Sequence, residues 1–307
     1  MISSQNFPSK VSLVEVGARD GLQNEALPVS AEIKINLVNQ LSAAGIVNIE
    51  CASFVSPKWV PAMASSSEVM AGIKRREGVI YSALTPNMQG LHAAIAARAN
   101  EVVIFGAASE AFSHKNINCS IAESIARFAP VASAAKAAGL RLRAAISCAF
   151  ACPYQGEVPL KDVLFCVDKF VALGCDDVGI ADTIGMGTAA QVQRVFAEAR
   201  ARYPEQQFSA HFHDTYGQAL ANILACLSVG IKVFDASVAG LGGCPYAKGA
   251  TGNVATEDVL YLLHGMGIDT GIDLNAVCEA GRYISSHLGR PPHSRVNRAL
   301  LAKASAA

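Results

Sequence analysis

Short apolar runs alternate with longer amphipathic patterns along most of the chain. The runs are rich in β-branched residues and indicate strands, whereas the patterns between them repeat at helical spacing. The expected strands cover residues 11–16, 46–50, 79–84, 101–105, 140–147, 177–181, 207–213 and 232–238. The expected helices cover residues 31–44, 63–76, 89–98, 121–138, 160–173, 189–202 and 218–229, followed by 257–265 and 275–288. This alternation predicts a parallel sheet with helices packed against it.

The number of strand–helix units favours a closed barrel. Eight parallel strands, each with a following helix, form a (β/α)8 TIM barrel, and this is the fold that we expect. An open doubly wound sheet is the alternative, but no Gly-x-Gly-x-x-Gly follows the first strand. We predict one catalytic domain over residues 1–307, with the barrel at about residues 11–240. A Gly-rich loop over residues 239–253 and extra C-terminal helices within residues 255–290 would follow, and the Ala-rich end from residue 302 is expected to fray.

Composition and charge narrow the class of protein. The 307 residues are 51% hydrophobic and 16% charged, which is typical of a folded globular chain. Lys+Arg 25 balances Asp+Glu 25, so the sequence does not indicate a nucleic acid or a membrane surface as a partner. No apolar run reaches the ~18 residues of a spanning helix, and the first residues lack the layout of a signal peptide. Nine cysteines without a Cys-x-x-Cys pair indicate reduced thiols. We therefore expect a cytoplasmic location.

The segment after residue 209 offers metal ligands. His211 and His213 are two residues apart on an expected strand, so their imidazoles point the same way, as a divalent metal requires. Asp20, at the end of the first strand, is the third candidate ligand, and Asn253 could add an amide oxygen. The alternatives are two ordinary half-buried histidines, a turn residue for Asp20 and a helix cap for Asn253.

Further charged residues are expected at the same end of the barrel, where barrel enzymes place their chemistry. Arg19 is a permanent cation beside the candidate metal site and could stabilise a developing oxyanion, although a surface salt bridge is the alternative. Glu50 and Asp182 could orient His or Arg or shuttle protons. They could equally be structural carboxylates at the barrel rim.

A glycine-rich segment follows the eighth expected strand. Residues 240–252 contain five glycines, which suits a mobile lid, and Cys244 within it could transfer a proton after closure. Phosphate binding by the glycines and a plain buried cysteine are the alternatives. Lys58 and Lys248 could meet anionic groups of a substrate, or be solvated lysines. Cys152 could line the substrate pocket or only pack.

The motifs that contain these residues resemble the 3-hydroxy-3-methylglutaryl-CoA lyase family. The matching stretches are residues 14–25, 53–61, 103–110, 115–120, 213–222 and 237–246, within a likeness that runs from about residue 11 to residue 288. The segment around Cys244 is specific to this family, whereas Arg19-Asp20 and His-x-His occur more widely in metal-dependent barrel enzymes that act on acyl-CoA and keto acids. Ala18 and Ala26 are peripheral departures from residues that are frequent in the family.

The resemblance implies a chemistry for each candidate. It implies Mg2+ or Mn2+ held by Asp20, His211 and His213, with Asn253 near. It implies Arg19 as the group that stabilises an enolate and Cys244 as an acid or base. The expected catalytic residues are Arg19, Asp20, Glu50, Asp182, His211 and Cys244. A homodimer is also expected from the family.

The predicted function is cleavage of 3-hydroxy-3-methylglutaryl-CoA to acetyl-CoA and acetoacetate, a reaction of leucine degradation and ketone-body formation. One alternative keeps the metal-dependent barrel but makes it an acyl-CoA-plus-2-oxo-acid synthase or a keto-acid aldolase. The segment around Cys244 argues against that alternative. Another alternative is a non-enzymatic metal-binding or assembly protein.

Overall fold

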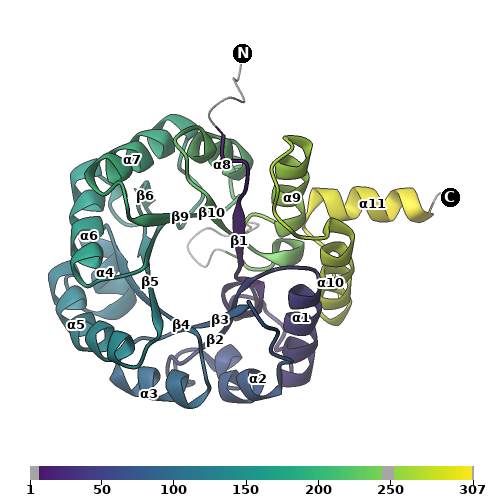
Figure 1. Cartoon of the computed structure of the whole chain (residues 1–307), viewed down its shortest axis with the longest axis horizontal. Coiled ribbons are helices and arrows are strands. Elements are labelled where there is room, and N and C mark those ends of the chain that lie inside the picture. The colour runs from purple at the N-terminus through teal and green to yellow at the C-terminus, as the bar shows by residue number, and fades with distance from the viewer. Residues whose placement is uncertain (1–6, 244–251, 306–307) are drawn as a thin grey trace.

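A closed barrel of parallel strands forms the centre of the molecule. The computed structural model describes residues 7–243 and 252–305. Figure 1 looks down the barrel, whose strands follow one another in the order β1-β10-β9-β8-β5-β4-β3-β2. The strands are β1 (Ser12–Glu15), β2 (Asn48–Ser53), β3 (Ile80–Leu84), β4 (Glu101–Ala107), β5 (Arg141–Ser147), β8 (Asp177–Asp182), β9 (Gln207–Phe212) and β10 (Val233–Ala236). The barrel closes where β1 pairs with β10 in parallel. The prediction of a (β/α)8 barrel is confirmed.

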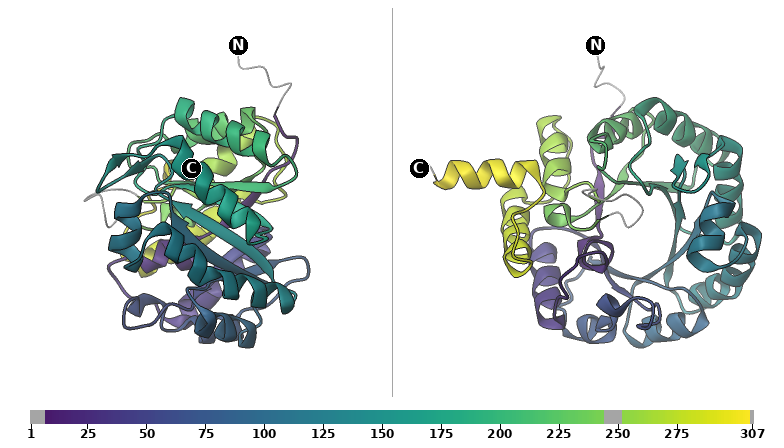
Figure 2. Two further views of the ribbon diagram at one scale, coloured as in Figure 1. Left: turned by 90° about the vertical axis from the view of Figure 1, so that its left-hand side faces the viewer. Right: turned by 180° about the vertical axis from the view of Figure 1, so that it is seen from behind.

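Helices surround the barrel on its outside (Figures 1 and 2). They are α1 (Ala31–Ala43), α2 (Ser66–Gly72), α3 (Met88–Ala96), α5 (Ile121–Ala137), α6 (Leu160–Ala172), α7 (Ala189–Arg202) and α8 (Ala219–Ser228). Beyond the last strand, α9 (Thr256–Gly265) packs on α8, and α10 (Leu274–His287) packs on α1. The two expected C-terminal helices are therefore present, and they extend the helical layer.

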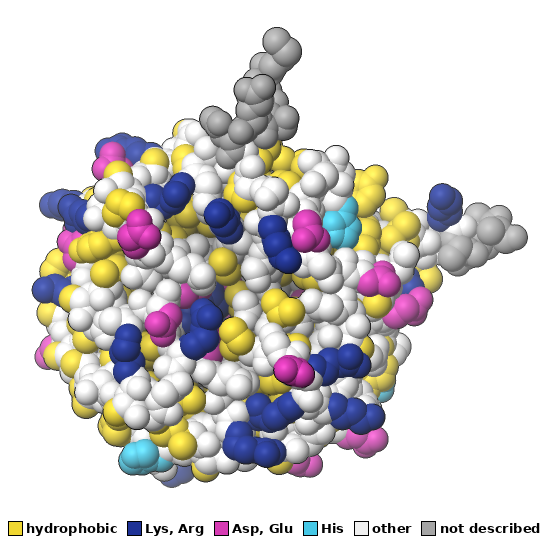
Figure 3. Space-filling view, viewed as in Figure 1, with side chains coloured by type: hydrophobic (Ala, Val, Ile, Leu, Met, Phe, Trp, Pro, Cys, Tyr) yellow, Lys and Arg dark blue, Asp and Glu magenta, His cyan; other side chains and the backbone are white. Residues whose placement is uncertain are grey.

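The core lies between the strands and this helical layer. Phe170 on α6, Phe196 on α7 and Phe234 on β10 are fully buried there. Because helices cover the outside of every strand and side chains fill the inside, the strands consist of nearly continuous buried residues. This is why they appear as apolar runs in the sequence. On the face drawn in Figure 3, basic and acidic side chains are interspersed, in keeping with their equal numbers.

Some local elements differ from the prediction. The helix expected at residues 63–76 is present as the shorter α2, and a 3-10 turn, η3 (Pro61–Met63), precedes it. An additional helix, α4 (Glu110–Ile117), follows β4, and a small hairpin of β6 (Ala151–Cys152) and β7 (Gly156–Glu157) follows β5.

The C-terminal end is a helix, and the prediction that it frays from residue 302 is wrong as far as Ser305. Helix α11 (Arg295–Ser305) begins where the Asp258 carboxylate accepts hydrogen bonds from the Arg295 and Val296 backbone N–H groups, at 3.2 and 2.9 Å. Ser294 Oγ donates to the same carboxylate at 2.7 Å. This start is fixed by a residue far back in the chain, so the local sequence does not reveal it. In the described part of the chain, no helix combines the length and apolarity that crossing a membrane requires.

Candidate metal centre and active site

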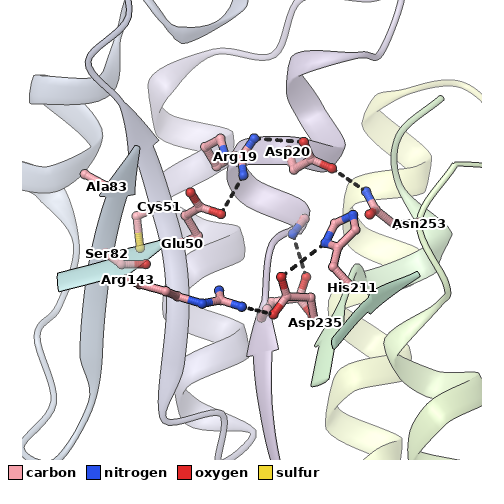
Figure 4. Close-up of polar contacts among 12 residues, drawn as sticks. Arg19, Asp20, Glu50, Cys51, Ser82, Ala83, Arg143, His211, Asp235 and Asn253 are labelled. Carbon is pink, nitrogen blue, oxygen red and sulfur yellow. Dashed lines mark hydrogen bonds and ion pairs between the residues drawn. The ribbon is translucent and has the colours of Figure 1, made fainter. Parts of the chain in front are cut away.

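A π-helical turn follows β1 and carries two of the candidate residues. This turn, η2 (Gly17–Gly21), contains Arg19 and Asp20, and the Gly21 backbone N–H donates to the Val16 carbonyl at 3.1 Å. π-Helical turns are rare and concentrate at functional sites. The turn directs the neighbouring Arg19 and Asp20 side chains toward the centre of the site (Figure 4).

Asp20, His211 and His213 converge. One ligand atom from each side chain lies within 4.8 Å of the others. His211 is the penultimate residue of β9 and His213 follows the strand, and their ring centroids are 5.3 Å apart. We call these three side chains the triad. Asp20 and the two histidines are far apart in the chain, but they meet because the carboxyl ends of the barrel strands lie at one rim.

The charge states of Asp20 and His213 suit metal binding. Burial raises the pKa of Asp20, but the positive charges of Arg19 and the two imidazoles outweigh burial and lower this pKa to about 2. Burial and the neighbouring His211 lower the pKa of His213 to about 4. At neutral pH the carboxylate is therefore charged and the His213 imidazole is neutral, which are the forms that ligate metals. His213 Nδ1 is buried without a hydrogen-bond partner among the described residues. This donor set fits a divalent metal ion.

Asp235 orients His211, although the apolar pattern of the eighth expected strand did not point to it. His211 Nδ1 donates to Asp235 Oδ2 at 3.1 Å, which leaves Nε2 as the other ring nitrogen for a ligand. Burial lowers the pKa of His211, but this hydrogen bond and the charges of Asp235 and Asp20 outweigh burial, so the pKa is raised. A carboxylate behind a metal-binding histidine fixes the ring orientation. The sequence offered one signal for Asp235, which is that a charged residue stands inside an expected apolar strand.

Arg19 is held by two carboxylates. Its Nη1 lies 2.8 Å from Asp20 Oδ1 and its Nη2 lies 2.8 Å from Glu50 Oε2. Burial lowers the pKa of Arg19, but the charges of Glu50 and Asp20 outweigh burial and raise it, so the guanidinium stays charged. The expectation that the second strand ends at Glu50 is wrong, because β2 continues to Ser53 through a bulge between Glu50 and Ala52. The Glu50 carboxylate nevertheless reaches the site (Figure 4).

Asn253 also reaches the triad. Its Nδ2 donates to Asp20 Oδ2 at 2.8 Å and to the Leu241 carbonyl at 3.3 Å. Helix α9 has Ala255 as its N-cap, without a capping side chain. The alternative that Asn253 caps this helix is therefore wrong.

Asp182, the last residue of β8, binds the loop that follows it. Its carboxylate accepts hydrogen bonds from the backbone N–H groups of Gly187, at 2.7 Å, and Met186, at 3.1 Å. Burial raises its pKa to about 6, against these hydrogen bonds and the nearby charge of His211. Its contacts support a structural role, while its pKa leaves it able to exchange a proton near neutral pH.

The two described ends of the Gly-rich segment meet beside the triad. Cys244 and Lys248 lie outside the described residues. Gly252 has φ +73°, and a Cβ there would lie 2.6 Å from the Gly242 carbonyl carbon, so only glycine fits without displacement. The Gly242 backbone N–H donates to Glu25 Oε1 at 3.1 Å, and the same carboxylate pairs with Arg290. The base of the segment is thus fixed next to Asn253.

Two secondary candidates have ordinary surroundings. Cys152 is buried in the β6–β7 hairpin, where its sulfur accepts hydrogen bonds from Ser109 Oγ at 3.0 Å and from the Tyr154 backbone N–H at 3.4 Å. Lys58 is exposed on the loop between β2 and η3. These contacts agree with the packing alternative for Cys152 and the solvated alternative for Lys58.

The fold and the triad define a (β/α)8-barrel protein with a candidate divalent-metal site at the carboxyl ends of its strands. A family model described as HMGL-like matches residues 10–284. The chain belongs to this HMGL-like family.

Curated proteins and solved structures agree with this assignment. The chain is 56% identical, over 97% of its length and 100% of the relative, to "3-hydroxy-3-isohexenylglutaryl-CoA/hydroxy-methylglutaryl-CoA lyase" of Pseudomonas aeruginosa. It is similar to the crystal structure of hydroxymethylglutaryl-CoA lyase from Pseudomonas aeruginosa, with TM-score 0.95, 56% identity, and coverage of 97% of this chain and 100% of that one. It is also similar to an HMG-CoA lyase from Acinetobacter baumannii in complex with coenzyme A and 3-methylmalate, with TM-score 0.90, 37% identity and 95% coverage of both chains.

Proposed function

We propose that the chain cleaves 3-hydroxy-3-methylglutaryl-CoA to acetyl-CoA and acetoacetate. It is a carbon–carbon lyase, as is its relative with 56% identity over nearly the whole of both chains. The observation that carries the proposal is the arrangement of Arg19 beside the triad. A fixed cation next to a candidate metal site is what cleavage to an enolate requires. The ligand class is an acyl-CoA, which the relative solved with coenzyme A supports.

The metal that we propose is Mg2+ or Mn2+. Asp20, His211 and His213 would hold it, with the amide oxygen of Asn253 as a further ligand after rotation of the amide. When bound, the ion supplies a Lewis acid to the hydroxyl and carboxylate groups of the substrate. Oxygen donors at two of these positions favour such hard ions over softer ones.

In the proposed reaction, the C3 hydroxyl loses its proton and becomes the ketone of acetoacetate. The electrons of the broken carbon–carbon bond pass to acetyl-CoA as its enolate. Arg19 faces the thioester oxygen, where the negative charge accumulates, and stabilises it from a position fixed in advance by Glu50 and Asp20. This preorganisation is the main contribution of the chain's own residues.

Two protons move in this reaction. Asp20 has a pKa of about 2, so we assign it to ligand binding and not to proton removal. Asp182, with a pKa of about 6, is better matched to accept the hydroxyl proton. Cys244, carried on the Gly-rich segment, is the proposed donor to the carbanion of acetyl-CoA.

Product analysis tests the proposal. The purified, metal-replete protein is incubated with 3-hydroxy-3-methylglutaryl-CoA, with and without chelator, and acetyl-CoA and acetoacetate are measured by mass spectrometry. We expect the two products in equal amounts and their loss with chelator. An intact substrate would refute the proposal. Release of free CoA from acetyl-CoA and a 2-oxo acid would instead support a synthase. If the protein catalyses neither reaction, the result would support a non-enzymatic metal-binding or assembly protein.

We propose 3-hydroxy-3-isohexenylglutaryl-CoA as a second substrate, because the name of the Pseudomonas relative contains this compound. The chain would then also accept a longer substituent at C3. Comparison of kcat/KM for the methyl and isohexenyl substrates decides this, and a ratio above about 10³ in favour of methyl would exclude the longer compound as a physiological substrate.

We further propose that the chain forms a homodimer in the cytoplasm. The bacterial relative supports this location. The dimer is an expectation from the family, and light scattering of the purified protein measures it directly.

A further inference from the structure

A charged cluster crosses the interior of the barrel below the triad. Arg143 on β5 lies with its Nη2 2.6 Å from Asp235 Oδ1 on β10 and 2.8 Å from Ser209 Oγ on β9. Its Nε lies 3.2 Å from Asp177 Oδ2 on β8. The side chains of Arg143, Asp177 and Asp235 are 4%, 3% and 9% exposed. Such buried charges are maintained only by good pairing, so their mutual geometry is tightly constrained.

Asp235 connects this cluster to the metal site. One of its oxygens, Oδ1, receives the Arg143 guanidinium, and the other, Oδ2, receives His211 Nδ1–H at 3.1 Å. Figure 4 shows the three side chains in a row from the barrel interior to the triad. Both carboxylate oxygens are occupied, so the carboxylate cannot rotate without losing one partner. The orientation of the His211 ring therefore depends on Arg143.

We propose that Arg143 is a positioning residue for the metal centre, acting on His211 through Asp235. The inference rests on the metal site proposed above. Without Arg143, Asp235 and Asp177 would be buried carboxylates that have lost their shared cation. Asp235 would turn toward another polar group or toward water, and His211 would lose the support that fixes its ring.

A second arginine on the same strand provides a matched control. Arg141 lies two residues before Arg143 and pairs with Glu101 on the adjacent β4, with Nε 3.1 Å from Oε2. Its side chain is 44% exposed. Loss of this pair removes an arginine–carboxylate contact from β5 while leaving the pair between Arg143 and Asp235 in place.

The test measures Mn2+ binding to the purified full-length chain after removal of metal, with free Mn2+ quantified by electron paramagnetic resonance. We expect Asp235→Asn to weaken Mn2+ binding by ~10–100-fold and Arg143→Gln by ~10-fold, as for other residues that support metal ligands. Arg141→Gln should bind as the wild type does. In the Asp235→Asn background, Arg143→Gln should cause no further loss, because the two residues act in one chain.

Two results would overturn the inference. One is unchanged Mn2+ affinity in folded Arg143→Gln, and the other is a double variant in which the two losses multiply, as independent structural damage would produce. If Arg143→Gln does not fold, Arg143→Lys serves instead: one ammonium group cannot reproduce all three contacts, so weaker binding is expected and wild-type affinity refutes the inference. His213→Ala tests the metal site itself. If Mn2+ binding is lost in His213→Ala but unchanged in the Arg143 variants, the result supports the proposed metal site and rejects only the positioning role of Arg143.

Discussion

Asn253 donates a hydrogen bond to the Asp20 carboxylate at 2.8 Å, although 233 positions separate the two residues in the chain. The bond joins the segment before α9 to the π-helical turn after β1. Because the same Asn253 amide also donates to the Leu241 carbonyl, the described base of the Gly-rich segment and the triad share one hydrogen-bond network. Changes at either end are therefore expected to affect the other.

Asn253→Ala is expected to weaken Mn2+ binding by about tenfold. The substitution removes the amide that donates to Asp20 and that, once rotated, would offer its oxygen to the metal. Equilibrium Mn2+ titration measures the change. Asn275→Ala, on the exposed first turn of α10, is the control and should bind Mn2+ normally. Equal affinities of all three proteins would show that Asn253 plays no part in the site.

Arg19→Met should lower kcat by ~10² or more, as expected for loss of a group that stabilises an oxyanion. Arg19→Lys keeps the positive charge but cannot reach Asp20 and Glu50 with two separate nitrogens, so an intermediate loss is expected. Steady-state kinetics with 3-hydroxy-3-methylglutaryl-CoA measure both variants. If the Met variant has a raised KM with an unchanged kcat, Arg19 only binds substrate and the proposed role is wrong.

Gly252→Ala tests the base of the Gly-rich segment. The new Cβ would lie 2.6 Å from the Gly242 carbonyl carbon, so the backbone at Gly252 must move away from Gly242 and shift Asn253. Gly267 has the same φ of +73° but open space around its Cβ position, so Gly267→Ala is a matched control for backbone strain alone. Each variant should lose about 1–2 kcal/mol of stability from the positive φ. Only Gly252→Ala should also lose turnover. If both variants lose turnover, the loss results from lower stability and not from the base of the Gly-rich segment.

The sequence predicts the fold and much of the site because both depend on repeated local rules. The alternation of strands and helices determines the barrel, and the barrel brings strand ends to one rim. Arg19, Asp20, His211 and His213 could thus be placed together from their positions in the pattern alone. The unusual turn around Arg19 could not, since a π-helix has no reliable local signal.

The missed residues depend on contacts between strands. Asp235 and Arg143 are charged residues within expected apolar strands, and nothing nearby in the sequence shows that they face each other across the barrel. Their pairing follows from the positions of β5 and β10 in the closed sheet. In the same way, Asp258 fixes the start of α11 from 37 residues away, so a composition that suggests fraying gives a helix.

Glu257 should make the stability of the chain fall as pH rises. Its carboxyl group is fully buried on α9, where it accepts hydrogen bonds from the Ala239 backbone N–H at 2.9 Å and from Asn297 Nδ2 at 2.9 Å. Burial raises its pKa from an ordinary value of 4.5 to about 8, against these hydrogen bonds and with help from the Glu15 charge. Between pH 4.5 and about 8 the folded chain therefore retains a proton that the unfolded chain has released.

In that pH window the unfolded state binds fewer protons at this group, so Glu257 lowers the free energy of unfolding by up to about 1.4 kcal/mol for each unit of rising pH. Glu257→Gln removes this dependence, and its free energy of unfolding should decline less than that of the wild type between pH 5 and pH 8. Urea unfolding at several pH values measures the difference. Glu279→Gln, a change on the exposed side of α10, should follow the wild-type slope. Identical slopes in all three proteins would mean that Glu257 is already ionised in the folded chain at pH 5.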